Sequence, residues 1–258
     1  MLWKGELMEW RTNYPHKKFW IDTRLSQEEM DFLWDIISEE NKEDHSGQLV
    51  GNITKSETIH DKDDWFYKTV LKKYTEKMFY REDNNYYKYH VEKEDSPPEF
   101  ELSSLWVNHQ NQHEFNPLPH IHGGLYTFVV FMKIPTHWKD QHALPFSTHS
   151  RSPCASDFQF VWSRKDRDEL IFRNFSLSPE DEGRMLFFPA TLQHQVFPFY
   201  GTEEERVTIS GNIILKEPNK PEIPVGEYEE KENMLKIMEN SVRVTKEELK
   251  MMKKGFSI

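Results

Sequence analysis

The chain has 258 residues, of which 36% are hydrophobic and 30% charged, and its formal net charge is −11. This length suits one large domain with a full core, and a negative charge without a basic stripe disfavours nucleic acid as a partner. The single Cys154 excludes a disulfide within the chain, the first residues lack the apolar stretch of a signal peptide, and no run approaches the ~18 apolar residues of a membrane span. We therefore expect a cytoplasmic protein without membrane contact.

Two helices are predicted in the first hundred residues. Ser26 and Glu29 form a capping box, and the apolar residues that follow at helical spacing are Met30, Leu33, Trp34 and Ile37. A second helix is predicted over 62–79, with a stripe made of Phe66, Val70, Tyr74 and Met78. Such stripes indicate packing against a sheet more often than a partner-binding face. Residues 81–99 read as a loop, so we expect 1–99 to be a helical and loop region that packs on a barrel.

The middle of the chain is rich in predicted strands. Segments with β-branched and aromatic residues lie at 101–109, 120–134, 157–163, 169–177, 184–189 and 206–216. No long helical pattern separates them, which favours antiparallel sheets closing as a barrel or sandwich over 100–217. Residues 136–156 are predicted to form a long loop at its rim. Beyond the prolines at 218, 221 and 224, a charged helical extension is predicted over 218–258, with helices at 227–241 and from Thr245, all within a single domain overall.

Three histidines form a candidate metal site. His120 and His122 are two residues apart at the entry to an apolar segment, and side chains with this spacing on an extended chain point to the same side. His194 lies just past the apolar run 185–189 and can return to the same end of the barrel. A lone histidine in a strand is usually a satisfied core or surface residue. Two imidazoles at the mouth of an apolar strand, however, favour binding of a transition metal.

Arg206 is a candidate for binding a carboxylate. Arg206, Thr208 and Ser210 share one face of the last predicted strand. This face is either the polar outer side of a half-exposed strand, or an inner face on which Arg206 binds a carboxylate bidentately with help from one of the two hydroxyls.

Two further residues are candidates for the lining of the same cavity. Asn108 shares a face with Trp106 and Gln110 in the first strand of the barrel. Tyr126 is in register with His120 and His122, provided that the two glycines between them do not shift the strand.

Three blocks of the sequence carry a resemblance to a known family. They are WVNHQNQHEFNPLPHIHGGLYTFVVFMKIP, EGRMLFFPATLQHQVFPFYG and ERVTISGNI, and the earlier segment GNITKSETIHDKDDWF is compatible with them. In this order they resemble the 2-oxoglutarate–Fe(II) oxygenases of tailed phages and marine bacteria, which are relatives of the prolyl hydroxylases. For a phage-encoded protein the compartment would be the host cytoplasm. The similarity covers about 100–216.

The resemblance implies a double-stranded β-helix, a jelly-roll or cupin-like barrel, with Fe(II) at its open end. Its cofactors would be Fe(II) and 2-oxoglutarate, and its partners 2-oxoglutarate, O2 and an unknown primary substrate. Decarboxylation of 2-oxoglutarate would be coupled to substrate oxidation of the hydroxylase type. By position, His120 and His194 match the two metal-binding histidines of the family, Arg206 matches its 2-oxoglutarate-binding arginine, and Thr208 replaces the usual serine partner.

His122 departs from the family pattern, because its position is that of the carboxylate in the His-x-Asp/Glu…His triad. Three interpretations follow. His122 is a true ligand in a three-histidine site, a carboxylate such as Glu114 completes the ligand set, or the position is open with His122 only nearby. We favour the first.

Two other function classes share the barrel. Three-histidine cupin-type metalloenzymes need no 2-oxoglutarate, and the spacing Gly183…Pro189…His194 fits their second motif. Against them, their expected glutamate would fall at Tyr126, and Arg206 has no role in that scheme. A non-catalytic barrel used for binding or assembly is the third class. The primary substrate and the oligomeric state are not encoded in any recognisable motif.

Overall fold

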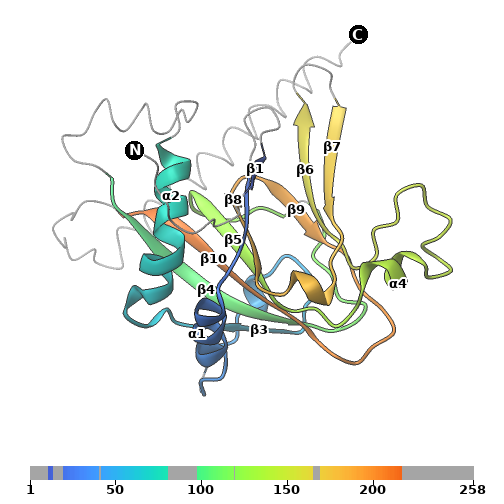
Figure 1. Ribbon diagram of the computed structural model, residues 1–258, viewed down its shortest axis with the longest axis horizontal. Helices are drawn as coiled ribbons and strands as arrows, with labels where there is room; N and C mark the ends of the chain where they lie inside the picture. Colours follow the sequence, from blue (N-terminus) through green and yellow to red (C-terminus); the bar gives the residue numbers. More distant parts are fainter. Residues whose placement is uncertain are drawn as a thin grey trace, which may run out of the picture. The chain divides into compact units, whose positions relative to one another are not determined.

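The computed structural model describes residues 11–13, 20–40, 42–80, 98–118, 120–164 and 169–216. Two antiparallel sheets dominate these residues (Figure 1). The larger sheet has the order β1-β2-β8-β5-β10-β4-β3. Its strands are β1 (Arg11–Asn13), β2 (Trp20–Arg24), β3 (Lys55–Thr58), β4 (Phe100–Gln110), β5 (Tyr126–Lys133), β8 (Arg184–Pro189) and β10 (Arg206–Leu215). The smaller sheet has the order β7-β6-β9 and contains β6 (Phe158–Arg164), β7 (Glu169–Phe175) and β9 (Gln193–Val196).

From β4 onward the chain passes back and forth between the two sheets. After β4 in the larger sheet, Asn116 forms a bridge with Val196 of β9 in the smaller one. The chain then returns to β5, crosses to the β6–β7 hairpin, returns to β8, crosses to β9 and returns to β10. Two sheets wound around each other in this way form a double-stranded β-helix, or jelly roll. The predicted fold class is therefore confirmed.

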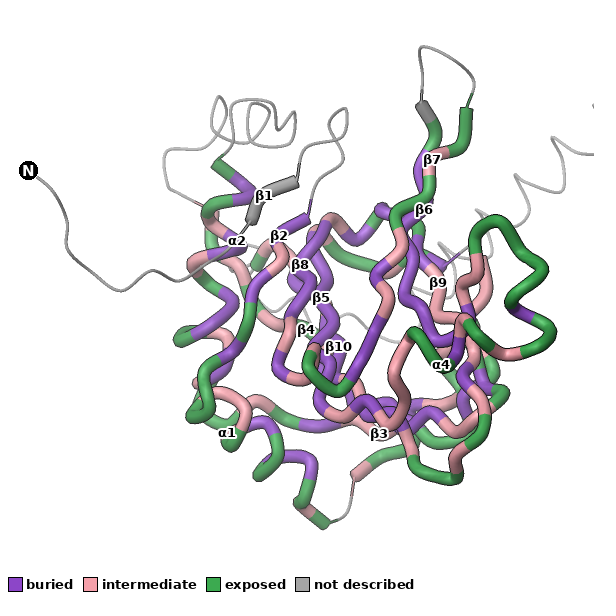
Figure 2. Tube along the Cα trace, turned by 45° about the vertical axis from the view of Figure 1, so that its right-hand side comes forward, coloured by how far each residue is buried: buried purple, intermediate pink, exposed green. Residues whose placement is uncertain are grey.

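The larger sheet is buried on both faces in its centre. Seven of the eight residues of β5 are buried, and Figure 2 shows β4, β5, β8 and β10 running through the interior. Strands of this kind read as continuous apolar runs rather than as alternating ones, because a layer covers each side. In β10, Gly211 allows close packing, since a Cβ there would lie 2.7 Å from the carbonyl oxygen of Ser104 and 2.9 Å from the ring of Phe128.

Helices cover one face of the larger sheet and the smaller sheet covers the other. Helix α1 (Gln27–Ile37) begins with the predicted capping box at Ser26 and Glu29. A π-helical stretch (Tyr67–Leu71) leads into α2 (Lys72–Phe79). Phe66, the residue just before this stretch, packs on Phe128 of β5. The core between the sheets is aromatic: Trp20 of β2 contacts Phe160 and Phe175. Both predicted helices are present and pack on the larger sheet. The opposite face of that sheet, which meets the smaller sheet, is left for a functional site.

The remaining short elements are α4 (Trp138–His142) and 3-10 turns at Ser46–Gln48, Lys62–Asp64 and Pro179–Asp181. Helix α4 lies inside the predicted loop 136–156, most of whose later residues are exposed (Figure 2). The compact unit ends at Lys216. The predicted helices at 227–241 and from Thr245, and most of the predicted loop 81–99, lie outside the described residues. Within the described residues, no helix is long and apolar enough to cross a membrane.

The structure corrects two sequence expectations. The first hundred residues supply strands as well as helices, because β2 pairs with β8 and β3 pairs with β4 at opposite sides of the larger sheet. The predicted strand 120–134 begins only at Tyr126. Gly124 has φ +90 and its Cα lies so close to Ile213 that a Cβ would be 2.9 Å from that carbonyl oxygen. This left-handed turn, which glycine adopts without strain, separates the histidine pair from the strand.

Candidate metal centre and cavity

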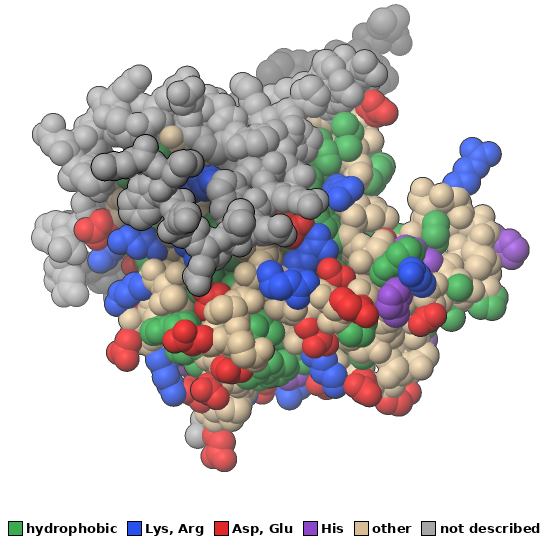
Figure 3. Space-filling model, viewed as in Figure 1, with side chains coloured by type: hydrophobic (Ala, Val, Ile, Leu, Met, Phe, Trp, Pro, Cys, Tyr) green, Lys and Arg blue, Asp and Glu red, His purple; other side chains and the backbone are tan. Residues whose placement is uncertain are grey.

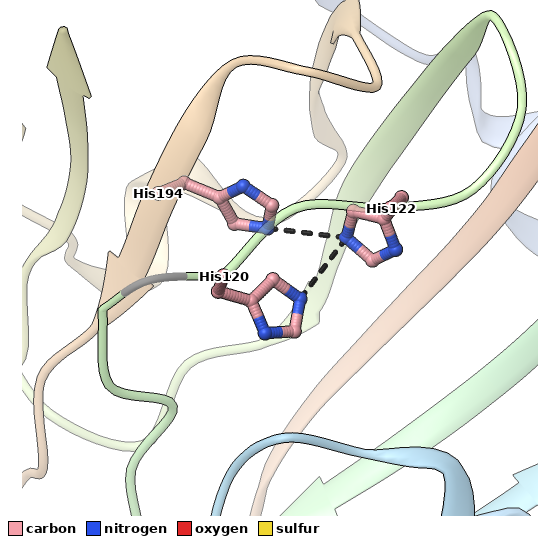
Figure 4. A group of neighbouring side chains, drawn as sticks. All are labelled: His120, His122 and His194. Atoms are coloured by element: carbon pink, nitrogen blue, oxygen red, sulfur yellow. Dashed lines mark hydrogen bonds between the residues drawn. The ribbon is translucent and has the colours of Figure 1, made fainter. Parts of the chain in front are cut away.

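Three imidazoles converge between the two sheets. His120 and His122 lie on the segment before β5, and His194 lies on β9 (Figure 4). The Nε2 atom of His122 is 3.1 Å from the Nε2 of His120 and 3.1 Å from the Nε2 of His194. Of the three residues, His120 and His194 are each only 5% exposed. The predicted convergence is therefore present, although the pair precedes the strand instead of starting it.

Backbone hydrogen bonds hold the histidine segment against β8 and β9. The N–H of His194 donates to the carbonyl oxygen of His120 at 3.2 Å, and the N–H of His122 donates to that of Ala190 at 3.0 Å. His194 also pairs across the smaller sheet with Phe160. Since His120 and His194 share a backbone hydrogen bond, their side chains are placed together by the sheet rather than by chance contact.

Burial keeps the three imidazoles neutral. Burial lowers the pKa of His120, and burial together with neighbouring His120 lowers the pKa of His122 to about 3. The pKa of His194 is held well below its usual value by burial and by the other two imidazoles. A neutral imidazole carries one N–H and one lone pair. The Nδ1 of His194 is 3.1 Å from the carbonyl oxygen of Leu192, which places the N–H there and leaves the lone pair on Nε2.

The three nitrogens fit a transition-metal ion. Imidazole ligands bind such ions at about 2.0–2.1 Å, so two ligands at right angles are about 3.0 Å apart. The two Nε2 separations of 3.1 Å match this spacing. Among the described residues, these histidines are the one group of three or more potential ligands that could hold a metal ion. Imidazole suits Fe, Zn, Cu and Ni, so the ligand type leaves the choice among these open.

Glu114, the candidate for a carboxylate ligand, is engaged elsewhere. Its Oε1 accepts hydrogen bonds from the backbone N–H and the hydroxyl of Thr54, at 3.1 and 2.6 Å. Its Oε2 accepts from the N–H of Asn111 at 2.9 Å. Glu114 therefore closes a loop beside β4 and belongs neither to the histidine cluster nor to the cavity wall.

Arg206 lies in the wall of the same cavity and is completely buried. Its Nη2 donates to the carbonyl oxygen of Ser156 at 2.9 Å and to the Ser156 hydroxyl, while its Nη1 is 3.4 Å from Oε1 of Gln110. The guanidinium stacks on Phe199, with 5.0 Å to the ring centroid. Among the described residues no carboxylate forms an ion pair with it, and its Nε has no partner. Burial lowers its pKa to about 10, so it stays charged at neutral pH.

A buried guanidinium without a carboxylate is costly to maintain, because desolvation of a charge is repaid only by a close counter-charge. The cavity that joins Arg206 to the histidines is where such a counter-charge can enter. This places the predicted carboxylate-binding arginine and the predicted metal ligands in one chamber.

Strand register explains which polar residues accompany Arg206. In the β10–β4 pair, Arg206 is opposite Gln110, Thr208 opposite Asn108, and Ser210 opposite Trp106. Directly opposed residues of neighbouring strands point to the same face. The structure thus brings Thr208, Ser210 and Asn108 into the cavity wall, although the Asn108 side-chain oxygen already accepts from Ser56 at 2.8 Å.

Tyr126 is not in the cavity. It is buried on the opposite face of β5, in the core under the helices, with its ring 5.6 Å from that of Phe187. The two glycines do shift the strand, because the left-handed turn at Gly124 breaks the period-two register on which the expectation depended. The prediction that Tyr126 binds the cofactor is therefore wrong.

Some residues that line the cavity or contact Arg206 were not identified as candidates from the sequence. Leu49 and Ile53 reach the cavity from the N-terminal region, and Ser156 reaches Arg206 from the end of the rim loop. Ile53 lies in a block that the family resemblance already included. Ser156 has no pattern that could have singled it out, because its role depends on a left-handed backbone at φ 73.

The region that builds this chamber matches a known family. Residues 104–212 match the model of a family described as "Putative 2OG-Fe(II) oxygenase". The match contains all three histidines and Arg206. No curated protein sequence matches the chain significantly.

Two solved structures are also similar. A prolyl-4-hydroxylase from Pseudomonas putida is 11% identical, with 76% of this chain and 92% of that chain covered and a TM-score of 0.41. An oxidoreductase of the 2OG-Fe(II) oxygenase family from Burkholderia pseudomallei is 9% identical, with 81% and 74% covered and a TM-score of 0.32. The double-stranded β-helix is assigned from the sheet topology of the chain itself.

Proposed function

We propose that this chain is a 2-oxoglutarate- and Fe(II)-dependent oxygenase of the hydroxylase type, because residues 104–212 match the model of a 2OG-Fe(II) oxygenase family. One structural observation supports the proposal independently of the family match. A completely buried arginine without a carboxylate partner among the described residues shares a cavity with three converging imidazoles. A keto acid with a distal carboxylate is a ligand that satisfies both ends of such a cavity.

The residues have separate roles in this proposal. His120, His122 and His194 hold Fe(II) through their Nε2 atoms. Arg206 binds the distal carboxylate of 2-oxoglutarate, and Thr208 and Ser210 offer hydroxyls on the same face. When bound, Fe(II) supplies the redox chemistry that couples decarboxylation of 2-oxoglutarate by O2 to oxidation of a second substrate. The apolar residues around the cavity, such as Phe131 and Phe188, exclude water and so strengthen the charge interactions inside.

The balance of charge supports a dianionic ligand. The three histidines are neutral and none of the described residues in the cavity wall is a carboxylate, so a bound divalent cation and Arg206 would leave the chamber positive. 2-Oxoglutarate carries two negative charges and would offset most of this excess. A site with one carboxylate ligand would need less compensation from its co-substrate.

A three-histidine metalloenzyme that does not use 2-oxoglutarate is the second candidate. The all-histidine ligand set favours it, because the family pattern has a carboxylate at the position of His122. It gives no role to Arg206, which forms no ion pair with a carboxylate of the described residues and has only the more distant charge of Asp157 to offset its own. The binding of 2-oxoglutarate therefore separates the two candidates.

The test is calorimetric titration of the Fe(II)-loaded protein with 2-oxoglutarate under anaerobic conditions, followed by measurement of succinate after addition of O2. We expect stoichiometric binding, and Arg206→Gln should weaken it by at least about 30-fold, since a buried charge pair is worth about 2 kcal/mol or more. Fe(II) binding should survive in that variant. Unchanged 2-oxoglutarate affinity in Arg206→Gln, or its absence in the parent protein, would contradict the proposal.

A further inference from the structure

Ser156 occupies an unusual backbone position beside Arg206. It is completely buried, and its φ of 73 lies in the left-handed region that residues with a Cβ seldom adopt. Gly, Asn or Asp would normally be found in such a conformation. A serine here needs an explanation from its contacts, because the turn itself does not favour it.

The left-handed conformation turns both oxygen atoms of Ser156 toward one guanidinium nitrogen. The carbonyl oxygen accepts from Nη2 of Arg206 at 2.9 Å, and the hydroxyl oxygen accepts from the same Nη2. The residue is itself anchored, since its N–H donates to the carbonyl oxygen of Pro198 at 2.8 Å and its hydroxyl is 3.2 Å from that of Thr136. Ser156 is thus a fixed double acceptor at one corner of the guanidinium.

These contacts orient the guanidinium without neutralising it. Ser156 and Gln110 are uncharged. Asp157, the next residue after Ser156, raises the pKa of Arg206 through its charge but directs both of its oxygens to other partners. Its Oδ1 is 3.0 Å from Nε2 of His142, and its Oδ2 accepts from Nδ2 of Asn174 at 3.1 Å. A carboxylate in place of Ser156 would compete with an anionic ligand for the arginine. Neutral acceptors leave its charge available to the cavity.

The donors that remain on Arg206 match this arrangement. Nε has no partner among the described residues, and the Nη1 contact to Gln110 is long at 3.4 Å. Only the Nη2 corner is saturated. The serine therefore fixes the plane of the fork while the rest of it stays free to bind.

We propose that Ser156 is a positioning residue for Arg206, which orients the guanidinium for the distal carboxylate of the keto acid. The inference rests on the proposed function and assigns to the end of the rim loop, rather than to β10, the control of how the co-substrate is held. Its effect on binding is transmitted only through Arg206.

The experiment compares Ser156→Ala and Ser156→Gly with the parent protein. Both variants remove the hydroxyl, and Ser156→Gly also removes the strain of a side chain at positive φ. We expect each to weaken anaerobic binding of 2-oxoglutarate to the Fe(II)-loaded protein by about tenfold, as is typical for losing a hydrogen bond to a charged group. Fe(II) affinity should stay unchanged. Ser147→Ala, at another buried serine of the same loop, is the matched control and should bind like the parent.

A second ligand distinguishes positioning from a general structural role. 2-Oxobutyrate has the keto-acid group but no distal carboxylate, so its affinity should be the same in the parent and in both Ser156 variants. In an Arg206→Gln background, Ser156→Ala should cause no further loss, because residues that act through one group are not additive. A loss of both keto acids in parallel would mark Ser156 as structural and overturn the inference.

The outcomes separate the two proposals. If the parent protein does not bind 2-oxoglutarate, the proposed function fails. If the parent binds it, Arg206→Gln loses it and both Ser156 variants bind it normally, the inference about Ser156 fails while the proposed function stands. A selective tenfold loss for 2-oxoglutarate in Ser156→Gly, with unfolding at the same temperature as the parent or above, supports the inference.

Discussion

Histidines among the described residues lie in two contrasting surroundings, and the contrast shows which group is suited to a ligand. His109, on β4, has Nδ1 2.9 Å from Oε2 of Glu205 and Nε2 3.6 Å from Oε2 of Glu57. The cavity histidines form a cluster that includes no carboxylate of the described residues, and they face one another instead. The Nδ1 of His109 is therefore paired with a carboxylate of the protein itself. Three neutral imidazoles with their Nε2 atoms about one point can together direct lone pairs at a metal ion.

The described residues on one face of the molecule show an ordinary mixture of surface charges. On the face shown in Figure 3, acidic and basic side chains of the described residues are interspersed, and no continuous basic stripe is visible among them. Lys133 with Glu204 and Lys216 with Glu99 are typical of these exposed pairs. Surface pairs of this kind contribute little to stability.

The largest expected effect is the loss of metal affinity when a cavity histidine, but not His109, is removed. His194→Ala is expected to lower Fe(II) affinity by more than about 100-fold, because it removes a ligand and not merely a group that orients one. His109→Ala is the matched control and should retain one equivalent of metal. Metal analysis after equilibrium dialysis measures both. Full metal retention in folded His194→Ala would refute the assignment of the site.

The second prediction concerns how the stability of the metal-free protein depends on pH when His122 is present and when it is replaced. Burial lowers the pKa of His122 from 6.5 to about 3, so below pH 6.5 the unfolded chain binds a proton that the folded chain does not. The contribution of His122 is therefore fully present above pH 6.5 and is lost as the pH falls toward 3, by on the order of 4 kcal/mol over the whole window.

Urea unfolding of the parent and of His122→Leu, at several pH values between 7 and roughly 4, measures this difference. The leucine variant cannot take up the proton, so its stability should fall less steeply with acid. Groups remote from the cavity titrate equally in both proteins and cancel, so the comparison reports on His122 together with its coupling to His120 and His194. Parallel curves would show that His122 is not buried neutral.

The smallest effect is expected from restoring the carboxylate of the family pattern. His122→Asp should bind Fe(II) about as tightly as the parent, because a carboxylate oxygen is also a suitable ligand and adds a negative charge beside the cation. Without metal the same variant should be less stable, since an unpaired carboxylate is then buried. Thermal unfolding with and without Fe(II) measures both effects. A folded His122→Asp protein without metal affinity would show that position 122 does not face the metal.

Much of the fold could be read from local patterns. The six predicted strands and the capping box at Ser26 are all present, because β-propensity and cap chemistry act over a few residues. The alternation in β10 correctly placed Arg206, Thr208 and Ser210 on one face. Period two says which side chains share a face, but not what that face meets. Only the pairing of β10 with β4 and the cover of the smaller sheet showed that this face is internal.

The amino-acid sequence by itself determined the chemistry of this protein: which imidazoles are available, that one arginine accompanies them, and that the barrel is built from antiparallel strands. The tertiary structure alone decided how these groups meet. It excluded Glu114 and Tyr126 from the cavity, added strands β2 and β3 from the N-terminal region, and brought Ser156 to Arg206 from a distance of 50 residues. Such contacts depend on strand register and on single left-handed residues, which no local pattern encodes because their energies arise only when the sheets pack.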